Sequence, residues 1–206
     1  MATKIDLNEM YDKIKSIGKM NAGIVTTKQI EEIGIYRGMI CKFVNDGRLV
    51  KEAKGIYSLA DEFPDEYALL QKRSEKIIFS YGTALYLWGM SDRIPHTISV
   101  TVPQGFNCTR IKKEFVKIKF HYVKKDIWNL GITNTDTAMG NKVMLYDKER
   151  CICDLFKRND YDYESVIYAI KEYKGYYLNI KKLYEYAKEL KVYEKVRNIF
   201  EVIGWN

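Results

Sequence analysis

The sequence contains few residues that interrupt or cross-link a chain. Only three of its 206 residues are proline and it has no Ser- or Gly-rich tract, so we expect no long linker. It has no run of about eighteen apolar residues, which argues against a membrane-spanning helix. The first residues lack the apolar segment of a secretory signal. We therefore expect a globular cytoplasmic protein.

Cysteine and histidine are also scarce. The four cysteines, Cys41, Cys108, Cys151 and Cys153, have no C-x-x-C spacing, and the last two are too close in sequence for a ready structural bridge. We interpret them as reduced, partly buried thiols. The two histidines, His96 and His121, lack metal-ligand spacing, so we expect no metal site.

Motifs for catalysis and cofactor binding are missing as well. The sequence has no G-x-S-x-G, no phosphate-binding G-x-x-x-x-G-K-[ST] loop and no G-x-G-x-x-G. It also lacks the Gly-Ser with paired aspartates that a nucleotidyltransferase needs. We therefore predict no catalytic residue and no cofactor.

The residues that are present favour an ordered, basic protein. Hydrophobic residues make up 47% of the chain and aromatic residues 14%, which is enough for a real core. The net charge is +7: residues 1–60 hold 10 Lys/Arg and 7 Asp/Glu, and residues 61–206 hold 24 and 20. The excess per residue is larger in the first segment, as a phosphate-binding domain requires.

Residues 1–60 show the element order of a winged helix. Leu7, Met10, Ile14 and Ile17 recur at helical spacing and predict a first helix with one apolar stripe. A short strand over 23–25 precedes a second helix, whose start fits a capping box of Thr26 and Gln29 and whose end fits Gly34. A third helix is predicted over 36–45, followed by a hairpin with strands at 49–51 and 56–59.

The third helix would be the one that enters the major groove of DNA. Its inward face is Ile40, Phe43 and Val44 and its outward face includes Tyr36, Arg37, Lys42 and Asn45, while Gly38 allows close approach. Arginine can read guanine, and lysine or asparagine can contact phosphates or base edges. Lys51 and Lys54 at the hairpin tip suit a phosphate or minor-groove contact. The alternative is a winged helix that contacts only a partner protein.

The remaining chain predicts an α+β domain over 61–206, so the fold class is α+β: an N-terminal winged helix-turn-helix, then a small sheet and a helical C-terminal tail. A helix should begin near Pro64. The predicted strands are 77–80, 96–103, 117–123 and 142–146, and the predicted helices are 82–89, 149–157, 163–173, 180–190 and one through 196–203.

Three features of this domain have a functional and a structural interpretation. Asp147 and Glu149 could hold Mg²⁺ in a DNA-cleaving enzyme, but a helix cap and a first-turn acid explain them better. Tyr81, Tyr86 and Trp88 form either a ligand patch or core. The tail is either a second nucleic-acid surface or a solvated lysine face over a tyrosine core; its residues are Tyr161, Tyr163, Tyr168, Tyr173, Tyr176, Tyr177, Tyr184, Tyr186, Tyr193, Lys171, Lys174, Lys181, Lys182 and Lys188.

The ordered set of segments resembles the AbiEi family, the antitoxins of abortive-infection type IV toxin–antitoxin operons. The resemblance extends from about residue 5 to residue 190, and the segments that carry it are Gly23–Gln29, Asp46–Leu49, Gly55–Tyr57, Ser80–Gly89, Ile98–Pro103 and Asp147–Phe156.

The resemblance implies a winged-helix repressor of its own operon, at residues 1–60, joined to an antitoxin domain at residues 61–206. It implies DNA contacts at Tyr36, Arg37, Lys42, Arg48, Lys51 and Lys54. The implied partners are double-stranded operator DNA with an inverted repeat, which suits a dimer, and a nucleotidyltransferase-like toxin that is neutralised without a stable complex. No membrane is implied.

Overall fold

The computed structural model describes residues 6–157, 162–175 and 179–202. It confirms the predicted α+β class. The chain forms two compact units, one from residues 1–74 with 136–142 and the other from residues 75–135 with 143–206. The predicted domain boundary after residue 60 stays a prediction.

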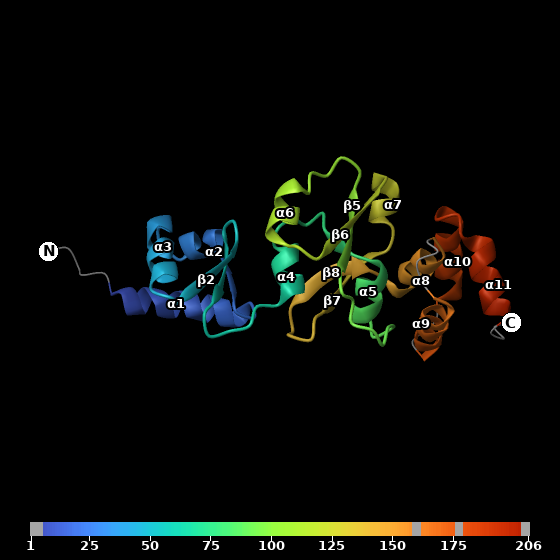
Figure 1. Ribbon diagram of the computed structural model, residues 1–206, viewed down its shortest axis with the longest axis horizontal. Coiled ribbons are helices and arrows are strands. Elements are labelled where there is room, and N and C mark those ends of the chain that lie inside the picture. The colour runs from blue at the N-terminus through green and yellow to red at the C-terminus, as the bar shows by residue number, and fades with distance from the viewer. Residues whose placement is uncertain (1–5, 158–161, 176–178, 203–206) are drawn as a thin grey trace. The chain divides into compact units, whose positions relative to one another are not determined.

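The first unit contains a winged helix-turn-helix. Helices α1 (Leu7–Met20), α2 (Thr27–Glu32) and α3 (Arg37–Asn45) gather beside a sheet of order β1-β3-β2 (Figure 1). Its strands are β1 (Ile24–Thr26), β2 (Leu49–Ala53) and β3 (Ile56–Leu59), and both pairings are antiparallel. Helix α4 (Glu66–Gln71) follows in the same unit and begins at Asp65, whose carboxylate accepts from the amides of Tyr67 and Ala68.

Local sequence signals fix both ends of α2. The Thr26 hydroxyl accepts from the Gln29 amide at 3.2 Å, and the Gln29 side chain accepts from the Thr26 amide at 2.9 Å. This confirms the predicted capping box, which satisfies two donors that the helix start would leave unpaired. The helix ends before Gly34, whose φ of +81° suits glycine. The Ile35 amide then bonds back to the Ile30 carbonyl, and the chain turns into α3.

The core of the winged helix comes from the predicted apolar positions. Ile14, Ile30, Ile40 and Phe43 are buried together, and Val44 packs against them partly buried. Because Ile40 and Phe43 lie three residues apart on α3, one side of this helix is fixed to the core. The opposite side of α3 is left at the surface.

The hairpin is longer than the sequence predicted. Strand β2 continues to Ala53, and only Lys54 and Gly55 form the turn, where Gly55 has a φ of +76°. The register shifts between Lys51 and Ala53, which leaves Glu52 in a bulge where it accepts a hydrogen bond from Ser58 at 2.5 Å. The bulge interrupts the alternation of apolar and polar side chains, so the sequence pattern predicted an end at Lys51, two residues before the observed end of β2.

Residues 78–146 contribute a five-stranded mixed sheet of order β6-β5-β4-β8-β7. Strand β4 pairs antiparallel with β5 and parallel with β8, and β5 pairs parallel with β6. The strands are β4 (Ile78–Phe79), β5 (Ile98–Pro103), β6 (Ile118–Val123), β7 (Ile132–Asp136) and β8 (Lys142–Tyr146). Strand β7 was not predicted.

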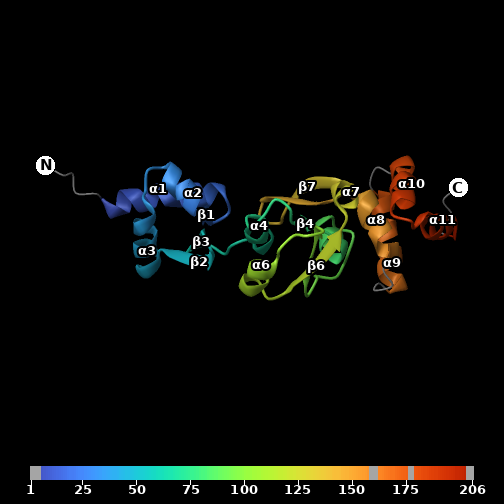
Figure 2. The same cartoon turned by 90° about the horizontal axis from the view of Figure 1, so that it is seen from above.

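Seven helices accompany this sheet within the described residues. They are α5 (Tyr81–Leu87), α6 (Thr109–Glu114), α7 (Lys125–Asn129), α8 (Lys148–Lys157), α9 (Tyr163–Gly175), α10 (Ile180–Glu189) and α11 (Tyr193–Val202). Figure 2 shows the last four grouped at the C-terminal end, as the predicted helical tail requires. Helices α6 and α7 were missed, because short charged segments carry no helical periodicity.

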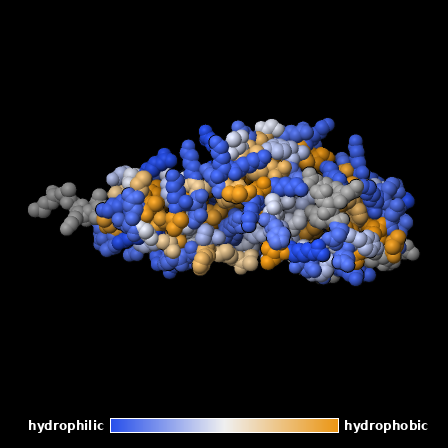
Figure 3. Space-filling view, in the orientation of Figure 1, coloured by the Kyte–Doolittle hydropathy of each residue, from blue (hydrophilic) through white to orange (hydrophobic). Residues whose placement is uncertain are grey.

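Most of the surface visible in Figure 3 is hydrophilic. On the face visible in Figure 3, hydrophobic residues lie in separate patches among hydrophilic ones. Within residues 6–157, 162–175 and 179–202, no helix combines the length and the apolar character needed to cross a membrane.

Candidate nucleic-acid interface

The outward side of α3 is exposed and carries positive charge. Arg37, Gly38, Cys41, Lys42 and Asn45 are all exposed. Arg37 and Cys41 are four residues apart, and so are Cys41 and Asn45, which places these three on one stripe of the helix. This side offers the guanidinium, ammonium and amide donors that read DNA.

An aromatic side chain covers the start of this helix. Tyr36 caps α3 without a side-chain hydrogen bond to it, and 64% of the residue is exposed. A Cβ on Gly38 would lie 2.4 Å from Cε2 of Tyr36, so the glycine makes room for the tyrosine ring. The sequence predicts that Gly38 lets a partner surface come close to α3. The structure shows that the group it approaches is Tyr36.

The two cations of α3 have no acidic partner within the described part of the chain. Neither Arg37 nor Lys42 forms an ion pair there, whereas Lys28 on α2 is paired with Glu32 at 3.7 Å and Lys13 on α1 with Glu9 at 2.9 Å. Each cation of α3 therefore keeps its full charge available for a phosphate.

The hairpin presents a second pair of cations. Lys51 on β2 and Lys54 in the turn are both exposed. The turn itself is anchored, because the Gly55 carbonyl accepts from the Thr27 amide at 2.9 Å and the Lys54 carbonyl accepts from Arg73 at 3.0 Å. The backbone that carries these lysines is thus held by α2 and by Arg73, the second residue after α4.

Arg48 differs from the other predicted contacts. Both terminal nitrogens of its guanidinium donate to the Asn8 side chain at 3.0 Å, and the group lies 5.1 Å from the centre of the Tyr11 ring. The Tyr11 hydroxyl in turn donates to the Arg48 carbonyl at 3.1 Å. Arg48 thus joins the hairpin to α1. To contact DNA, its guanidinium would have to bind the phosphate in addition to Asn8 and Tyr11, or release them.

The predicted residues therefore fall into three places. Tyr36, Arg37 and Lys42 are brought together on α3, Lys51 and Lys54 on the hairpin, and Arg48 is held against α1. Sequence reasoning missed the supporting roles of Asn8 and Arg73. Their partners lie 40 and 19 residues away along the chain, and neither has a local sequence signal.

The structure explains Asp147 and Glu149 without a metal. The Asp147 carboxylate accepts from the Arg150 amide at 2.9 Å, which confirms it as a helix cap. The Lys182 ammonium lies 2.9 Å from Asp147 and 3.2 Å from Glu149, between the two carboxylates. Tyr173 donates to Glu149 and Tyr186 to Asp147. Within the described residues, no group of three or more His, Cys, Asp or Glu side chains is arranged to hold a metal ion.

Burial and charge set the acidity of this group. Burial raises the pKa of Asp147, although hydrogen bonds from Lys182 and from the Arg150 amide oppose the shift. Burial also acts to lower the pKa of Lys182, but its contacts with Asp147 and Glu149 outweigh this and raise it. The ammonium therefore stays charged and occupies the position that a divalent cation would need.

A buried ion pair lies one turn further along α8. The Arg150 side chain is 1% exposed and the Asp154 side chain 0%, and Nε of Arg150 is 3.0 Å from Asp154. Arg150 also donates to the carbonyls of Ile127 and Leu130 and stacks over the Tyr146 ring at 4.2 Å. The pair spans one turn of the helix and is buried, so removal of one partner would leave an uncompensated charge.

The aromatic residues singled out in the sequence are mostly structural. Tyr81 is buried, and Trp88 donates to the Tyr146 carbonyl at 2.9 Å. In the tail, Tyr173 is fully buried and Tyr163 is 65% exposed. Among the lysines of the tail, Lys171, Lys174, Lys181 and Lys188 are exposed. Tyr161, Tyr176 and Tyr177 lie outside the described residues.

The element order, the three-stranded sheet and the exposed cationic side of α3 define the class of the first unit as a winged helix-turn-helix. Residues 13–60 match the family described as "Transcriptional regulator, AbiEi antitoxin". The expected resemblance to AbiEi antitoxins is thus confirmed for this segment, which spans most of the winged helix.

A solved structure extends the likeness in fold. The crystal structure of the Rv2827c protein from Mycobacterium tuberculosis aligns with a TM-score of 0.52 over 88% of this chain and 76% of that one, at 14% sequence identity. At this identity the likeness concerns the fold alone. The search of curated proteins gave no match.

Proposed function

We propose that the protein is an antitoxin that binds operator DNA through its winged helix and represses its own operon. The observation that carries this proposal is the exposed side of α3, where Arg37 and Lys42 have no acidic partner within the described residues. The match of residues 13–60 to a family of transcriptional regulators supports it.

In the proposed complex α3 enters the major groove. Arg37 reads a base edge or binds phosphate, Lys42 binds phosphate, and Tyr36 packs against the sugar–phosphate backbone. Lys51 and Lys54 contact the backbone beside the groove, and Arg48 contributes charge from its position at α1. One winged helix covers a short half-site, so two copies of the protein would bind an inverted repeat. Binding to operator DNA would place the protein in the cytoplasm.

The test is a titration of a labelled DNA fragment from upstream of the operon with the full chain, followed by fluorescence anisotropy. Reversal of both charges, Arg37→Glu with Lys42→Glu, should abolish binding. The matched control is Lys13→Glu with Lys19→Glu, which makes the same charge change at exposed positions of α1. Unchanged binding by the α3 variant would refute the role of this helix.

We further propose that the domain over 61–206 has the antitoxic role and no catalytic activity, metal or cofactor. Its functional partner would be a nucleotidyltransferase-like toxin encoded beside it, neutralised without a stable complex. Co-expression with the neighbouring gene product should restore growth, while size-exclusion chromatography should show the two proteins eluting apart. A stable stoichiometric complex, together with no binding to the upstream DNA, would instead assign the protein to direct binding of its partner.

A further inference from the structure

The second unit contains an open pocket between α5, β6, α7 and α8. The pocket has a volume of about 600 Å³, within the range of about 300–1,000 Å³ that small-molecule sites occupy. Its walls include Tyr81, His121, Lys124, Ile127 and Lys157. None of these residues belongs to the winged helix, so the pocket shares no residue with the proposed DNA interface.

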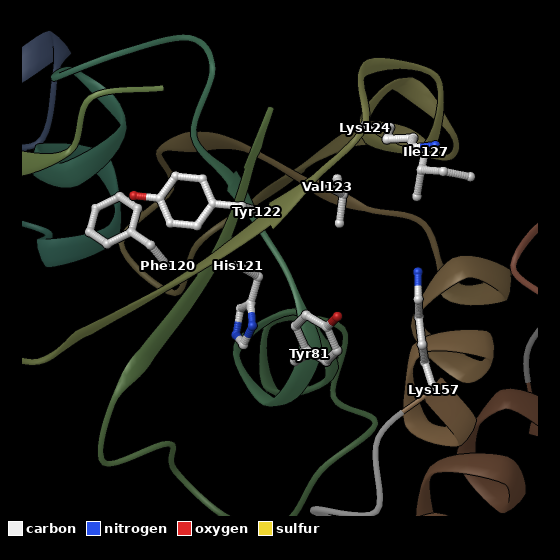
Figure 4. Close-up of a pocket in the computed structure, with 8 residues that line it drawn as sticks. All are labelled: Tyr81, Phe120, His121, Tyr122, Val123, Lys124, Ile127 and Lys157. Atoms are coloured by element: carbon white, nitrogen blue, oxygen red, sulfur yellow. The ribbon is translucent and has the colours of Figure 1, made fainter. Parts of the chain in front are cut away.

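Two of the residues that line the pocket, Tyr81 and His121, have their rings in contact. Tyr81 begins α5 with a φ of +52°, a conformation that is uncommon for residues other than glycine. Its ring centre lies 4.2 Å from that of His121, and both residues are buried. Backbone strain of this kind persists where the surroundings hold it, and it is concentrated at binding and active sites. Figure 4 shows the Tyr81 hydroxyl directed toward the open space.

The charged residues of the pocket wall are all positive. Lys124 and Lys157 contribute ammonium groups, and the wall residues include no carboxylate. In Figure 4 the Lys157 side chain extends from α8 into the space below β6. Desolvation lowers the pKa of Lys157, although Asp154 acts in the opposite direction. A negatively charged ligand beside this ammonium would favour its charged form.

The remaining wall is apolar. Val123 and Ile127 are half-buried and face the same space, while Phe120 and Tyr122 point to the other side of β6 (Figure 4). The site therefore combines two cations, a hydroxyl and the edge of an aromatic pair with an aliphatic surface. A ligand that satisfies all of these has a phosphate at one end and a flat ring system at the other.

We propose that this pocket binds a phosphorylated nucleoside. The phosphate lies between Lys124 and Lys157 with a hydrogen bond from Tyr81, and the nucleoside covers Val123 and Ile127. Charge-assisted hydrogen bonds hold the phosphate, and the apolar contact with Val123 and Ile127 adds affinity without selecting one base. The same chemistry would fit a free nucleotide or the terminal nucleotide of a nucleic acid.

Isothermal titration calorimetry on the full chain tests the proposal. The probes are the four common nucleoside monophosphates, adenosine, inorganic phosphate and a short single-stranded oligonucleotide with a terminal phosphate. At least one monophosphate should bind with a Kd of about 1 mM or tighter. Adenosine and inorganic phosphate should each bind at least about tenfold more weakly, since each lacks one half of the recognised ligand.

Variants separate this site from general attraction to a basic protein. Lys157→Ala and Lys124→Ala should each weaken binding about tenfold. Lys125→Ala is the matched control, because Lys125 is exposed, adjacent in sequence and not part of the pocket wall. Tighter binding of the oligonucleotide, lost in the same two variants, would assign the pocket to a nucleic-acid end.

Three results would overturn the proposal. The first is that no monophosphate and no oligonucleotide binds. The second is that inorganic phosphate binds as tightly as the monophosphates. The third is that Lys125→Ala loses as much affinity as Lys124→Ala and Lys157→Ala. Operator binding by the same variants is a separate readout, and it should stay at the wild-type level because α3 and the hairpin are untouched.

Discussion

The two lysines of the hairpin give a quantitative test of how the winged helix binds DNA. Lys51 on β2 and Lys54 in the turn are both exposed, and Thr27 and Arg73 hold the backbone of the turn. Replacement of both by alanine removes two charges while the hydrogen bonds of the turn backbone remain. Because the side chains are at the surface, folding stability should change by less than about 0.5 kcal/mol per substitution. The effect should therefore be confined to DNA binding.

The magnitude follows from the number of phosphates contacted. If Lys42, Lys51 and Lys54 each neutralise one phosphate, two copies on an inverted repeat neutralise about six, and log K falls with log salt with a slope of about −5. Without Lys51 and Lys54 about two contacts remain, and the slope becomes about −2. Between about 50 and about 200 mM salt, binding should weaken roughly a thousandfold for the wild type and roughly tenfold for the variant.

Fluorescence anisotropy of a labelled upstream DNA fragment over a salt series measures both slopes. The control is Lys13→Ala with Lys19→Ala, which removes the same charge from exposed positions of α1 and should keep the wild-type slope. The same slope for wild type and the hairpin variant would refute the phosphate contacts. An equal decrease in the control would mean that net charge, rather than the hairpin, sets the salt dependence.

Three further predictions concern Gly38, Lys182 and the cysteines. Gly38→Ala should weaken DNA binding because the new Cβ would lie 2.4 Å from the Tyr36 ring and displace it. Thermal melting should show a stability that is unchanged or raised by up to about 1 kcal/mol, because alanine is the better helix former. A large loss of stability would contradict this prediction. Lys182→Met leaves Asp147 and Glu149 without their shared ammonium and should lower the free energy of unfolding by about 1–2 kcal/mol. The difference in unfolding free energy between wild type and variant should become smaller as the pH falls through the raised pKa of Asp147, because Lys182 stabilises the fold only while the carboxylate is ionised. Urea titrations that show the same difference down to acidic pH would contradict this. Burial raises the pKa of Cys151 and Cys153, so the native protein should show one rapidly alkylated thiol, at exposed Cys41, and four in urea; mass spectrometry of the alkylated peptides checks this.

Local chemistry made much of the winged helix predictable. The Thr26 and Gln29 side chains cap α2 as their spacing indicates, and Gly34 ends it. The three-residue spacing of Ile40 and Phe43 fixed the buried side of α3 and, with it, the exposed side. These features depend on neighbours within a few residues of one another, which is the range over which sequence patterns carry information.

Features that depend on distant residues were not predictable. Arg48 has a side chain of the type that contacts DNA, but Asn8 and Tyr11 hold it against α1. Lys182 was counted with a solvated lysine face, yet it joins two carboxylates more than thirty positions earlier. Likewise, β7 alternates polar threonines and asparagine instead of apolar residues, and only its neighbour β8 makes it a strand.

The central claim is that α3 lies against operator DNA, and Cys41 reports on it directly. Its thiol is exposed on α3, one turn from Arg37 and next to Lys42. The measurement is the alkylation rate of Cys41 by mass spectrometry, with the upstream DNA fragment at saturation and with a scrambled duplex at the same salt. The upstream fragment should slow the reaction at least about tenfold relative to the scrambled duplex, because a helix in the major groove is shielded from reagent. An unchanged rate on saturated DNA would contradict the assignment of α3 as the recognition helix.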